Sequence, residues 1–516
     1  MELKVTKENI TSAEVVFSDT NEQSIELDYI LPDYYPEIFK ILKCIVKPCI
    51  VSQNIDKDKL IYEMSVCIRI LYSAENSSAV NIIDQKLTYS KKVDIGRICT
   101  TPEISIVPQI NYINCRAVNS RRIDMRGAIS TSVMISDLIC NNAISDVVGG
   151  NIQLKKVSLT YPSNQINIFK PIIVSDKFDL GLSKPSIINI VRNDAIVTSI
   201  DKKIIANKLI VKGEICINML YTCIKDNNDS LEAMQFTLPF SNVIDIEGLD
   251  DRYECVINPD IVSCDITPCS DGDGNSKIAE CTINVLVSVS AYKTSTADLA
   301  VDAYSTSFST NNEKKDIFLE ASPQIINNMC VIKSTLTSTD DEIDCIFDAW
   351  CNLKNISIVP DMDEKCLKVN GTVTYIVIAK NIDKNPVLIE KEESYSVSVP
   401  VENISENLRI NLKLIPVSCS YNLTSDNTIE IKAELKATGY INNIFVINGI
   451  TEIIINEDEP INKNNKYALK IYYTDENEDL WEIAKKYGTS VSAIIEENEI
   501  EDDTIAGNGM ILIPIV

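Results

Sequence analysis

The stretch that decides the fold is Lys208–Tyr221, which reads KLIVKGEICINMLY. From Leu209 to Met219 every second position is apolar or glycine, whereas the positions between them include Lys212 and Glu214. This period of two predicts a β-strand with one apolar face. Such a strand is typical of an antiparallel sheet that covers a core on one side.

The same pattern occurs twice more, in Lys59–Tyr72 (KLIYEMSVCIRILY) and in Cys366–Ala379 (CLKVNGTVTYIVIA). The copies are about 150 residues apart, which is the spacing of whole domains and not of solenoid repeats. Each copy is preceded by a proline and, two residues later, an isoleucine, at Pro36, Pro185 and Pro323. The chain therefore contains three copies of one module.

Other alternating runs, separated by Gly, Asn and Asp turns, surround each copy. We predict a mainly β fold with three tandem β-sandwich or barrel-like modules and a small C-terminal domain. The expected divisions are an N-terminal segment 1–24 and modules at 25–150, 172–296 and 315–450. The boundaries lie near 151–171, 297–314 and 451–466, and the last of these is expected to be an exposed linker. The third copy carries an insertion whose acidic run, Asp340 to Asp344, is expected to be a solvated loop.

The tail from residue 467 has a different pattern. Leu480–Tyr487 places apolar residues at helical spacing, with Asp479 at the N-cap position and Gly488 where a helix ends. A second short helix follows, and Met510–Ile515 reads as a closing strand. We predict a small βααβ domain over residues 467–516.

Charge and composition exclude several classes of function. Lysine and arginine total 48 against 74 acidic residues, a net charge of −26. Nucleic-acid binding and docking on anionic lipid both need a basic surface, so neither is expected. The chain has no histidine, which excludes Ser-His-Asp triads and HExxH metal sites within it.

The 17 cysteines form no CxxC motif, so we interpret them as reduced thiols that pack like small apolar residues in a cytosolic protein. The start, Met1–Glu8, has no apolar stretch, so no secretory signal is expected, and no segment is long and apolar enough to cross a membrane. Asp271–Asn275 begins like a calcium loop, but Ser276 and Thr282 stand where glycine and glutamate are needed. A hairpin turn is the expectation there, and no metal or cofactor is expected.

The string Asp479–Ser490 (DLWEIAKKYGTS) and the terminal Ile-Leu-Ile-Pro resemble a LysM domain. LysM domains bind N-acetylglucosamine-containing glycans in a groove between two loops. The tail departs from the family in both loops, because Asn477–Asp479 replaces Gly-Asp-Thr and Asn498–Ile500 replaces Asn-Gly-Leu. It is also acidic, with three lysines against eleven carboxylates. The resemblance places the groove, for a protein partner or a glycan, at Asn477, Glu478, Asp479, Leu480, Trp481, Asn498, Glu499 and Ile500.

The β-modules and the single C-terminal LysM domain together resemble the SipL/SPOCS spore-coat assembly family. The matching residues are the opening Leu31–Ile38 (LPDYYPEI) and the strands centred on Gly213 and Gly371. The resemblance implies a sporulation protein of the mother-cell cytoplasm that acts at the forespore surface. It would tether the coat's morphogenetic ATPase there, with LysM as a protein-binding module.

We therefore predict a non-enzymatic coat-assembly protein. The alternative is an exported surface protein whose LysM domain binds peptidoglycan or chitin, and a hydrolase hidden in the β-modules is a third option. Trp481 is one of only two tryptophans. It either packs inside the small tail core or forms a partly exposed anchor for a partner, the type of residue enriched at binding hot spots.

Overall fold

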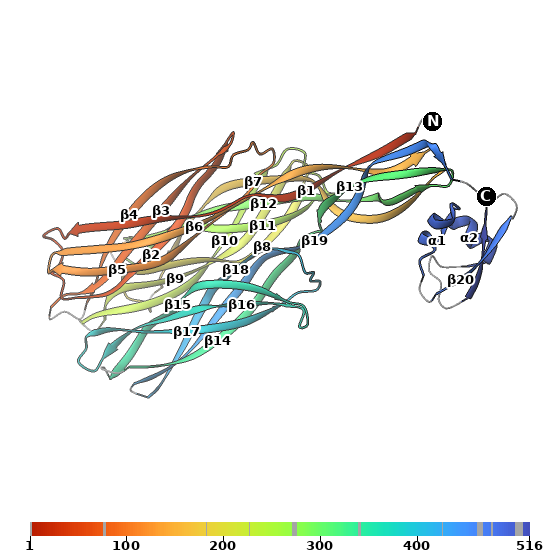
Figure 1. The fold of residues 1–516 in the computed structure, drawn as a ribbon. Helices are drawn as coiled ribbons and strands as arrows, with labels where there is room; N and C mark the ends of the chain where they lie inside the picture. The colour runs from red at the N-terminus through yellow and green to blue at the C-terminus, as the bar shows by residue number, and fades with distance from the viewer. Residues whose placement is uncertain are drawn as a thin grey trace.

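The computed structural model describes residues 3–75, 79–181, 183–225, 228–270, 276–338, 342–425, 427–461, 468–475, 478–500 and 509–515. About four fifths of the chain is β-strand, and the strands pair antiparallel, which confirms the predicted mainly β class. The calcium-like run 271–275 and the first two residues of the acidic run, Asp340 and Asp341, lie outside the described residues. Figure 1 shows three packed β-modules, a narrower extension from them, and the tail domain beside its end.

The first module consists of two three-stranded antiparallel sheets. The first sheet has the order β2 (Lys40–Asp56), β3 (Lys59–Ser73) and β4 (Val80–Asp94), and the second has β1 (Lys4–Ile30), β6 (Arg122–Val148) and β5 (Glu103–Asn119). The repeated sequence segment is the middle strand β3. Its alternate side chains enter a core that both sheets share, as its period of two predicts.

The second and third modules repeat this arrangement. The second has β8 (Asn189–Ile205), β9 (Lys208–Lys225) and β10 (Asn228–Asp245) in one sheet, and β11 (Glu254–Cys269), β12 (Ile278–Ser305) and β7 (Ile152–Asp179) in the other. The third has β15 (Ile343–Asp361), β16 (Cys366–Asn381) and β17 (Pro386–Pro400) facing β14 (Gln324–Thr337), β19 (Thr428–Pro460) and β18 (Leu408–Ser425). Each of these modules also has its own apolar core.

The conserved spacing between the proline and the strand end within copies one and two has a physical cause. The hydroxyl of Tyr72 donates to the carbonyl of Pro36 at 3.0 Å, and the hydroxyl of Tyr221 donates to the carbonyl of Pro185 at 3.2 Å. Both tyrosines are buried, and a buried hydroxyl needs a partner. Ala379 takes this position in the third copy and cannot make the bond.

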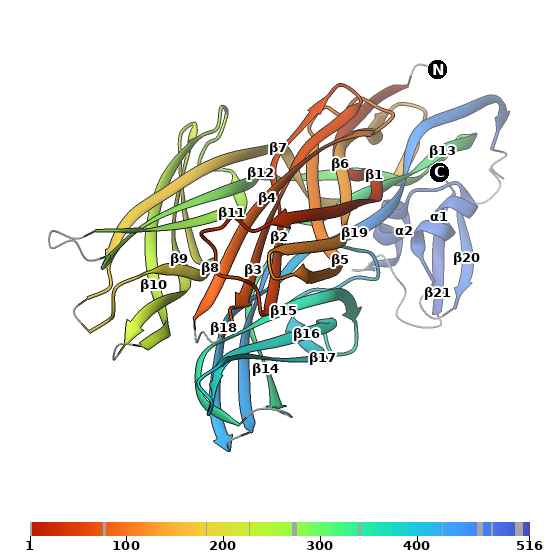
Figure 2. The same cartoon turned by 90° about the vertical axis from the view of Figure 1, so that its left-hand side faces the viewer.

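The three modules meet at a common apolar cluster, which we call the junction core. It is formed by Leu71, Val80, Val191, Leu220, Leu231, Trp350, Ile376 and Ile378. Leu71, Leu220 and Ile378 occupy the same position of the repeated segment, so equivalent surfaces of the modules face one another. Figure 2 shows the modules extending from this region in different directions.

Ion pairs join the modules around this core. Pairs across module boundaries connect Lys43 with Glu390 (2.6 Å), Arg409 with Glu103 (3.1 Å) and Lys413 with Asp260 (2.5 Å). Arg409 is buried, and it also pairs with Glu320 at 3.0 Å. Buried charges of this kind need partners, and here the partners come from two modules.

Beyond the modules, three strand pairs continue together as an extension that we call the stalk. It consists of residues 4–14 with 137–148, 152–163 with 293–305, and 308–320 with 444–460, where β13 (Phe308–Glu320) pairs with the end of β19. Small apolar clusters containing Ile10, Leu299 and Ile317, or Ile144 and Ile450, fill its interior.

The strands of the stalk run through the expected module boundaries and through most of the expected linker. Residues 152–171, 297–305, 308–314 and 451–460 lie in paired strands, and most of the expected N-terminal segment 1–24 lies in β1. The outer faces of these strands are polar, so their sequences resemble loops. Each strand nevertheless has a neighbouring strand that satisfies its backbone hydrogen bonds. The last part of the expected linker, residues 462–466, lies outside the described residues.

The tail domain contains β20 (Leu469–Thr474), α1 (Leu480–Tyr487), α2 (Val491–Asn498) and β21 (Gly509–Pro514). β20 and β21 pair antiparallel, so the predicted βααβ order is confirmed. Neither helix, nor any other in the described part of the chain, is long and apolar enough to span a bilayer.

The junction core makes a stability prediction. Leu220→Ala removes a fully buried side chain from it, and we expect the free energy of unfolding to fall by about 2–5 kcal/mol. Urea unfolding followed by circular dichroism measures the change. Ile224→Ala, on the same strand at 59% exposure, is the control and should change it by less than about 0.5 kcal/mol. Equal effects of the two variants would contradict the shared core.

Candidate functional site

Helix α1 begins as the sequence predicts. The carboxylate of Asp479 accepts a hydrogen bond from the backbone N–H of Trp481 at 2.9 Å, and Gly488 ends the helix with a positive φ of 63°. Helix α2 begins at a second cap, where the hydroxyl of Ser490 accepts from the N–H of Ala493 at 3.1 Å. The two caps fix the loops that flank the expected groove.

In the first loop, Asn477 lies outside the described residues, and the side chain of Glu478 is engaged within the domain. Its carboxylate accepts from the hydroxyl of Tyr472 at 2.6 Å and from the N–H of Asp475 at 3.2 Å. Leu480 is fully buried in the tail core. These residues therefore shape the loop.

Trp481 lies between the tail domain and the stalk. Its indole Nε1 donates to Oδ2 of Asp302 on β12 at 2.8 Å, and its ring meets that of Tyr304 edge-on, with centroids 4.9 Å apart. The side chain is only 7% exposed. Trp481 thus belongs to the tail core, as one interpretation of the sequence predicts, and it also contacts the stalk of the same chain. It is not the partly exposed residue of the other interpretation, and its role as an anchor for a partner stays a prediction.

Two further contacts from the stalk surround Trp481. Nζ of Lys485 lies 2.6 Å from the same Oδ2 of Asp302, and the hydroxyl of Tyr304 donates to the carbonyl of Thr489 at 2.7 Å. Lys155 on β7 pairs with Asp479 at 2.5 Å. We call Lys155, Asp302 and Tyr304 the stalk tip. Sequence reasoning missed all three, because nothing in the pattern of β7 or β12 indicates what packs against their ends.

The two carboxylates at this contact have shifted pKa values. Burial raises the pKa of Asp302, but the ammonium of Lys485 and the indole N–H of Trp481 outweigh it, so the pKa lies below its usual value. Burial acts in the same way on Asp479. Lys155 and the N–H of Trp481 outweigh it there, and this pKa is also lowered. Both groups therefore favour the docked arrangement in their charged forms.

The second loop is held inside the tail domain. The amide of Asn498 donates to the carbonyls of Ile494 (2.8 Å) and Leu512 (2.6 Å) and accepts from the N–H of Leu512 at 2.7 Å. Asn498 thus fastens α2 to β21. Glu499 follows with a positive φ of 53°, a conformation that favours glycine, and Ile500 packs against the core.

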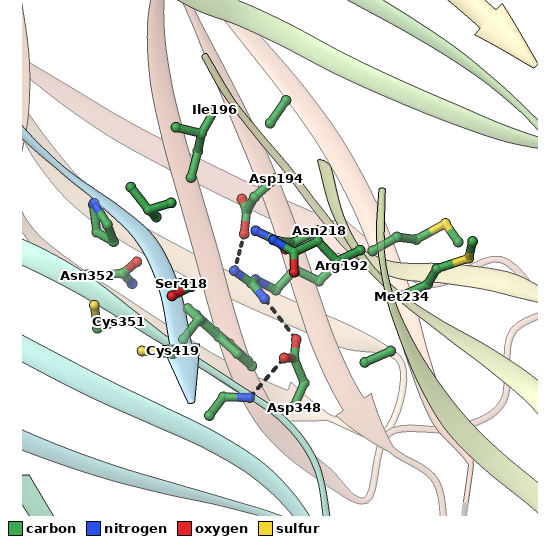
Figure 3. A pocket seen from close by; sticks show the side chains of 18 of the residues that line it. Arg192, Asp194, Ile196, Asn218, Met234, Asp348, Cys351, Asn352, Ser418 and Cys419 are labelled. Atoms are coloured by element: carbon green, nitrogen blue, oxygen red, sulfur yellow. Dashed lines mark hydrogen bonds and ion pairs between the residues drawn. The ribbon is translucent and has the colours of Figure 1, made fainter. Parts of the chain in front are cut away.

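A separate cavity of about 430 Å³ lies between the second and third modules, and Figure 3 shows the side chains around it. The guanidinium of Arg192 lies at its centre. It pairs with Asp348 at 2.8 Å and with Asp194, and it stacks 4.5 Å above the ring of Trp350. Sequence reasoning did not single out this site.

The charges in this cavity satisfy one another. Burial raises the pKa of Asp194, but Arg192 and Lys47 of the first module outweigh it and hold the pKa well below its usual value. Burial raises the pKa of Asp348 despite Arg192. Because Arg192 contacts two carboxylates and an aromatic ring, the cavity is best explained as a polar joint that fixes three modules.

In the described part of the chain, no three or more Cys, Asp or Glu side chains gather in a way that could hold a metal ion. Each cysteine is free. A hydrogen bond with a neighbouring thiol lowers the pKa of Cys115, Cys281 and Cys351. Burial raises the pKa of several others, including Cys49 to about 11, and thiols with a raised pKa are poor nucleophiles.

Comparison with known families matches both parts of the architecture. The model of the SipL SPOCS domain matches residues 37–118 and 186–268, which cover β2–β5 and β8–β11 except for the last residue of β5 and of β11. The LysM model matches residues 475–514. Neither a curated protein nor a solved structure gives a match to this chain. The chain therefore combines SipL-type SPOCS domains with a C-terminal LysM domain, as the resemblance indicated.

The conformation of Glu499 predicts a stabilising substitution. Glu499→Gly should slow hydrogen exchange of the α2 amides by stabilising the helix end by about 1 kcal/mol, because glycine adopts a positive φ without strain. Glu497→Gly, inside α2, is the matched control and should destabilise the helix by about 1 kcal/mol. Faster exchange in Glu499→Gly would contradict the prediction and would show that the Glu499 side chain itself stabilises the end of α2.

The lowered pKa values of Asp302 and Asp479 predict release of the LysM domain in acid. Their contribution to docking is present above the ordinary carboxyl value of 3.8 and is lost as the pH falls through the lowered values. In a Trp350→Phe background, Trp481 is the remaining indole, and its fluorescence should shift to longer wavelength below about pH 3.8. Asp302→Asn should reduce this pH dependence. A constant spectrum while circular dichroism still shows folded sheet would contradict the docking.

Proposed function

We propose that this chain is a non-enzymatic sporulation protein that helps to assemble the spore coat at the forespore surface, in the mother-cell cytoplasm. Its LysM domain binds the coat's morphogenetic ATPase, and its β-modules form a rigid support that holds the LysM domain at the end of the stalk. The SPOCS and LysM families are binding or structural domains, which supports a role in assembly.

The proposal rests on the second loop of the LysM domain, where two side chains limit access to the expected sugar site. The amide side chain of Asn498 is hydrogen-bonded to the backbone of α2 and β21, and Glu499 replaces a glycine next to the expected sugar site. A residue with a side chain hinders the close approach of a backbone to a ligand. Trp481 is an aromatic side chain of the type that anchors protein interfaces, and its indole already makes such a contact with Asp302 of the stalk.

Binding of an N-acetylglucosamine-containing glycan is the second candidate. The match of residues 475–514 to the LysM model favours it, because the family includes glycan-binding domains. In that case, the loop that begins at Asn498 would contact the sugar by its backbone. The acidic character of the tail gives no advantage for binding a neutral glycan.

The test uses the purified full chain and a chain that ends at residue 466, each immobilised and exposed to the purified coat ATPase. The proposal is supported if the full chain binds the ATPase and the shortened chain does not. In a parallel assay, both chains are exposed to cell wall, and soluble N-acetylglucosamine oligomers are added to compete for that binding. Retention of cell wall by the full chain, abolished by the oligomers, together with no binding of the ATPase, would favour the glycan candidate instead.

Trp481 gives a quantitative prediction. Trp481→Ala should weaken ATPase binding by about 2 kcal/mol, which is about 30-fold in Kd, when measured by interferometry on protein whose β spectrum is unchanged. Tyr473→Ala is the matched control, because Tyr473 is an aromatic residue of the same domain with 76% exposure on β20. Loss of binding in Tyr473→Ala and not in Trp481→Ala would move the site to the sheet.

A further inference from the structure

The face of the LysM domain that carries Trp481 is already occupied within the chain. Asp302 accepts from the indole N–H and pairs with Lys485, and Tyr304 packs edge-on against the indole ring. Tyr304 is buried, and it belongs to the same apolar cluster as the LysM core. The stalk tip thus binds the domain as a partner would.

The contact is complementary in chemistry. From the LysM side come an indole N–H, the ammonium of Lys485 and an aromatic ring, which together suit a carboxylate next to a phenol. Asp302 and Tyr304 provide these groups. They stand two residues apart on strand β12, and residues at this spacing project from the same face of a strand.

The contact is also small in comparison with the junctions between modules. The apolar part supplied by the stalk is Tyr304, whereas the junction core buries large side chains from all three modules. The remaining contacts are the hydrogen bonds Trp481–Asp302 and Tyr304–Thr489 and a few ion pairs. Among the ion pairs, Lys155–Asp479 has side chains that are 42% and 36% exposed, and exposed pairs contribute little. A partner with the same groups can therefore replace the stalk tip.

We infer that the Trp481 face of the LysM domain is the surface that binds the protein partner. The partner presents a carboxylate and an aromatic ring two residues apart on an extended segment. Asp302 and Tyr304 occupy this surface until the partner displaces them. The inference rests on the proposed function, since it assumes a protein partner for the LysM domain. It adds the chemistry of that partner and a competition within the chain.

The first experiment tests the competition without a partner. In the Trp350→Phe background, Tyr304→Ala and Asp302→Asn should each shift Trp481 fluorescence to longer wavelength and raise its quenching by acrylamide about twofold or more, because the indole becomes exposed. Asp298→Asn is the control. Asp298 lies on the same strand and accepts from Ser158 of the stalk at 2.5 Å. An unchanged spectrum in both test variants would overturn the inference.

The second experiment measures binding of the purified coat ATPase to the full-length variants. Because the competing residues are removed, Tyr304→Ala should bind about fivefold or more tightly than the parent, with Asp298→Asn unchanged. The double variant Tyr304→Ala, Trp481→Ala should lose this gain. Equal binding by parent and Tyr304→Ala, or weaker binding by Tyr304→Ala, would overturn the competition while leaving the proposed function in place. Absence of ATPase binding in every variant would instead reject the proposed function.

Discussion

The structure depends on the burial of apolar surface where the three modules meet. Leu71, Leu220 and Ile378 lie at one position of the repeated strand, and all three enter the same cluster. A sandwich that buries only its own interior leaves this position facing water, at a cost of roughly 1.5–3 kcal/mol for each large side chain. The modules therefore stabilise one another, and the chain forms one support with approximate three-fold repetition.

This packing explains why so many charges are paired at module boundaries. Removal of apolar surface from water also dehydrates the neighbouring charged groups, which must then find partners. Arg192 meets Asp194 and Asp348, and Arg409 meets Glu103 and Glu320. Because each arginine bridges two carboxylates, one of them from another module, the relative positions of the modules are fixed by geometry as well as by apolar contact.

The sequence was sufficient for the fold class and for the tail domain. A period of two in Lys208–Tyr221 and helical spacing in Leu480–Tyr487 are local patterns, and local patterns are visible in one sequence. The stalk was not predictable, because its strands alternate polar and apolar residues weakly and resemble linkers. The pairing of Arg192 with Asp348 was also hidden, since it depends on how two modules pack and not on any spacing along the chain.

The candidate site shows the same division. Asp479 could be placed at a helix cap from its sequence neighbours, whereas the partner of Trp481 could not, because Asp302 comes from a distant strand. The residues that receive the LysM domain, Lys155, Asp302 and Tyr304, all belong to the second module's strands β7 and β12. The three-fold repetition is therefore broken at the stalk tip. Repetition supplies the rigid support, and a local difference in one copy gives the LysM domain its place.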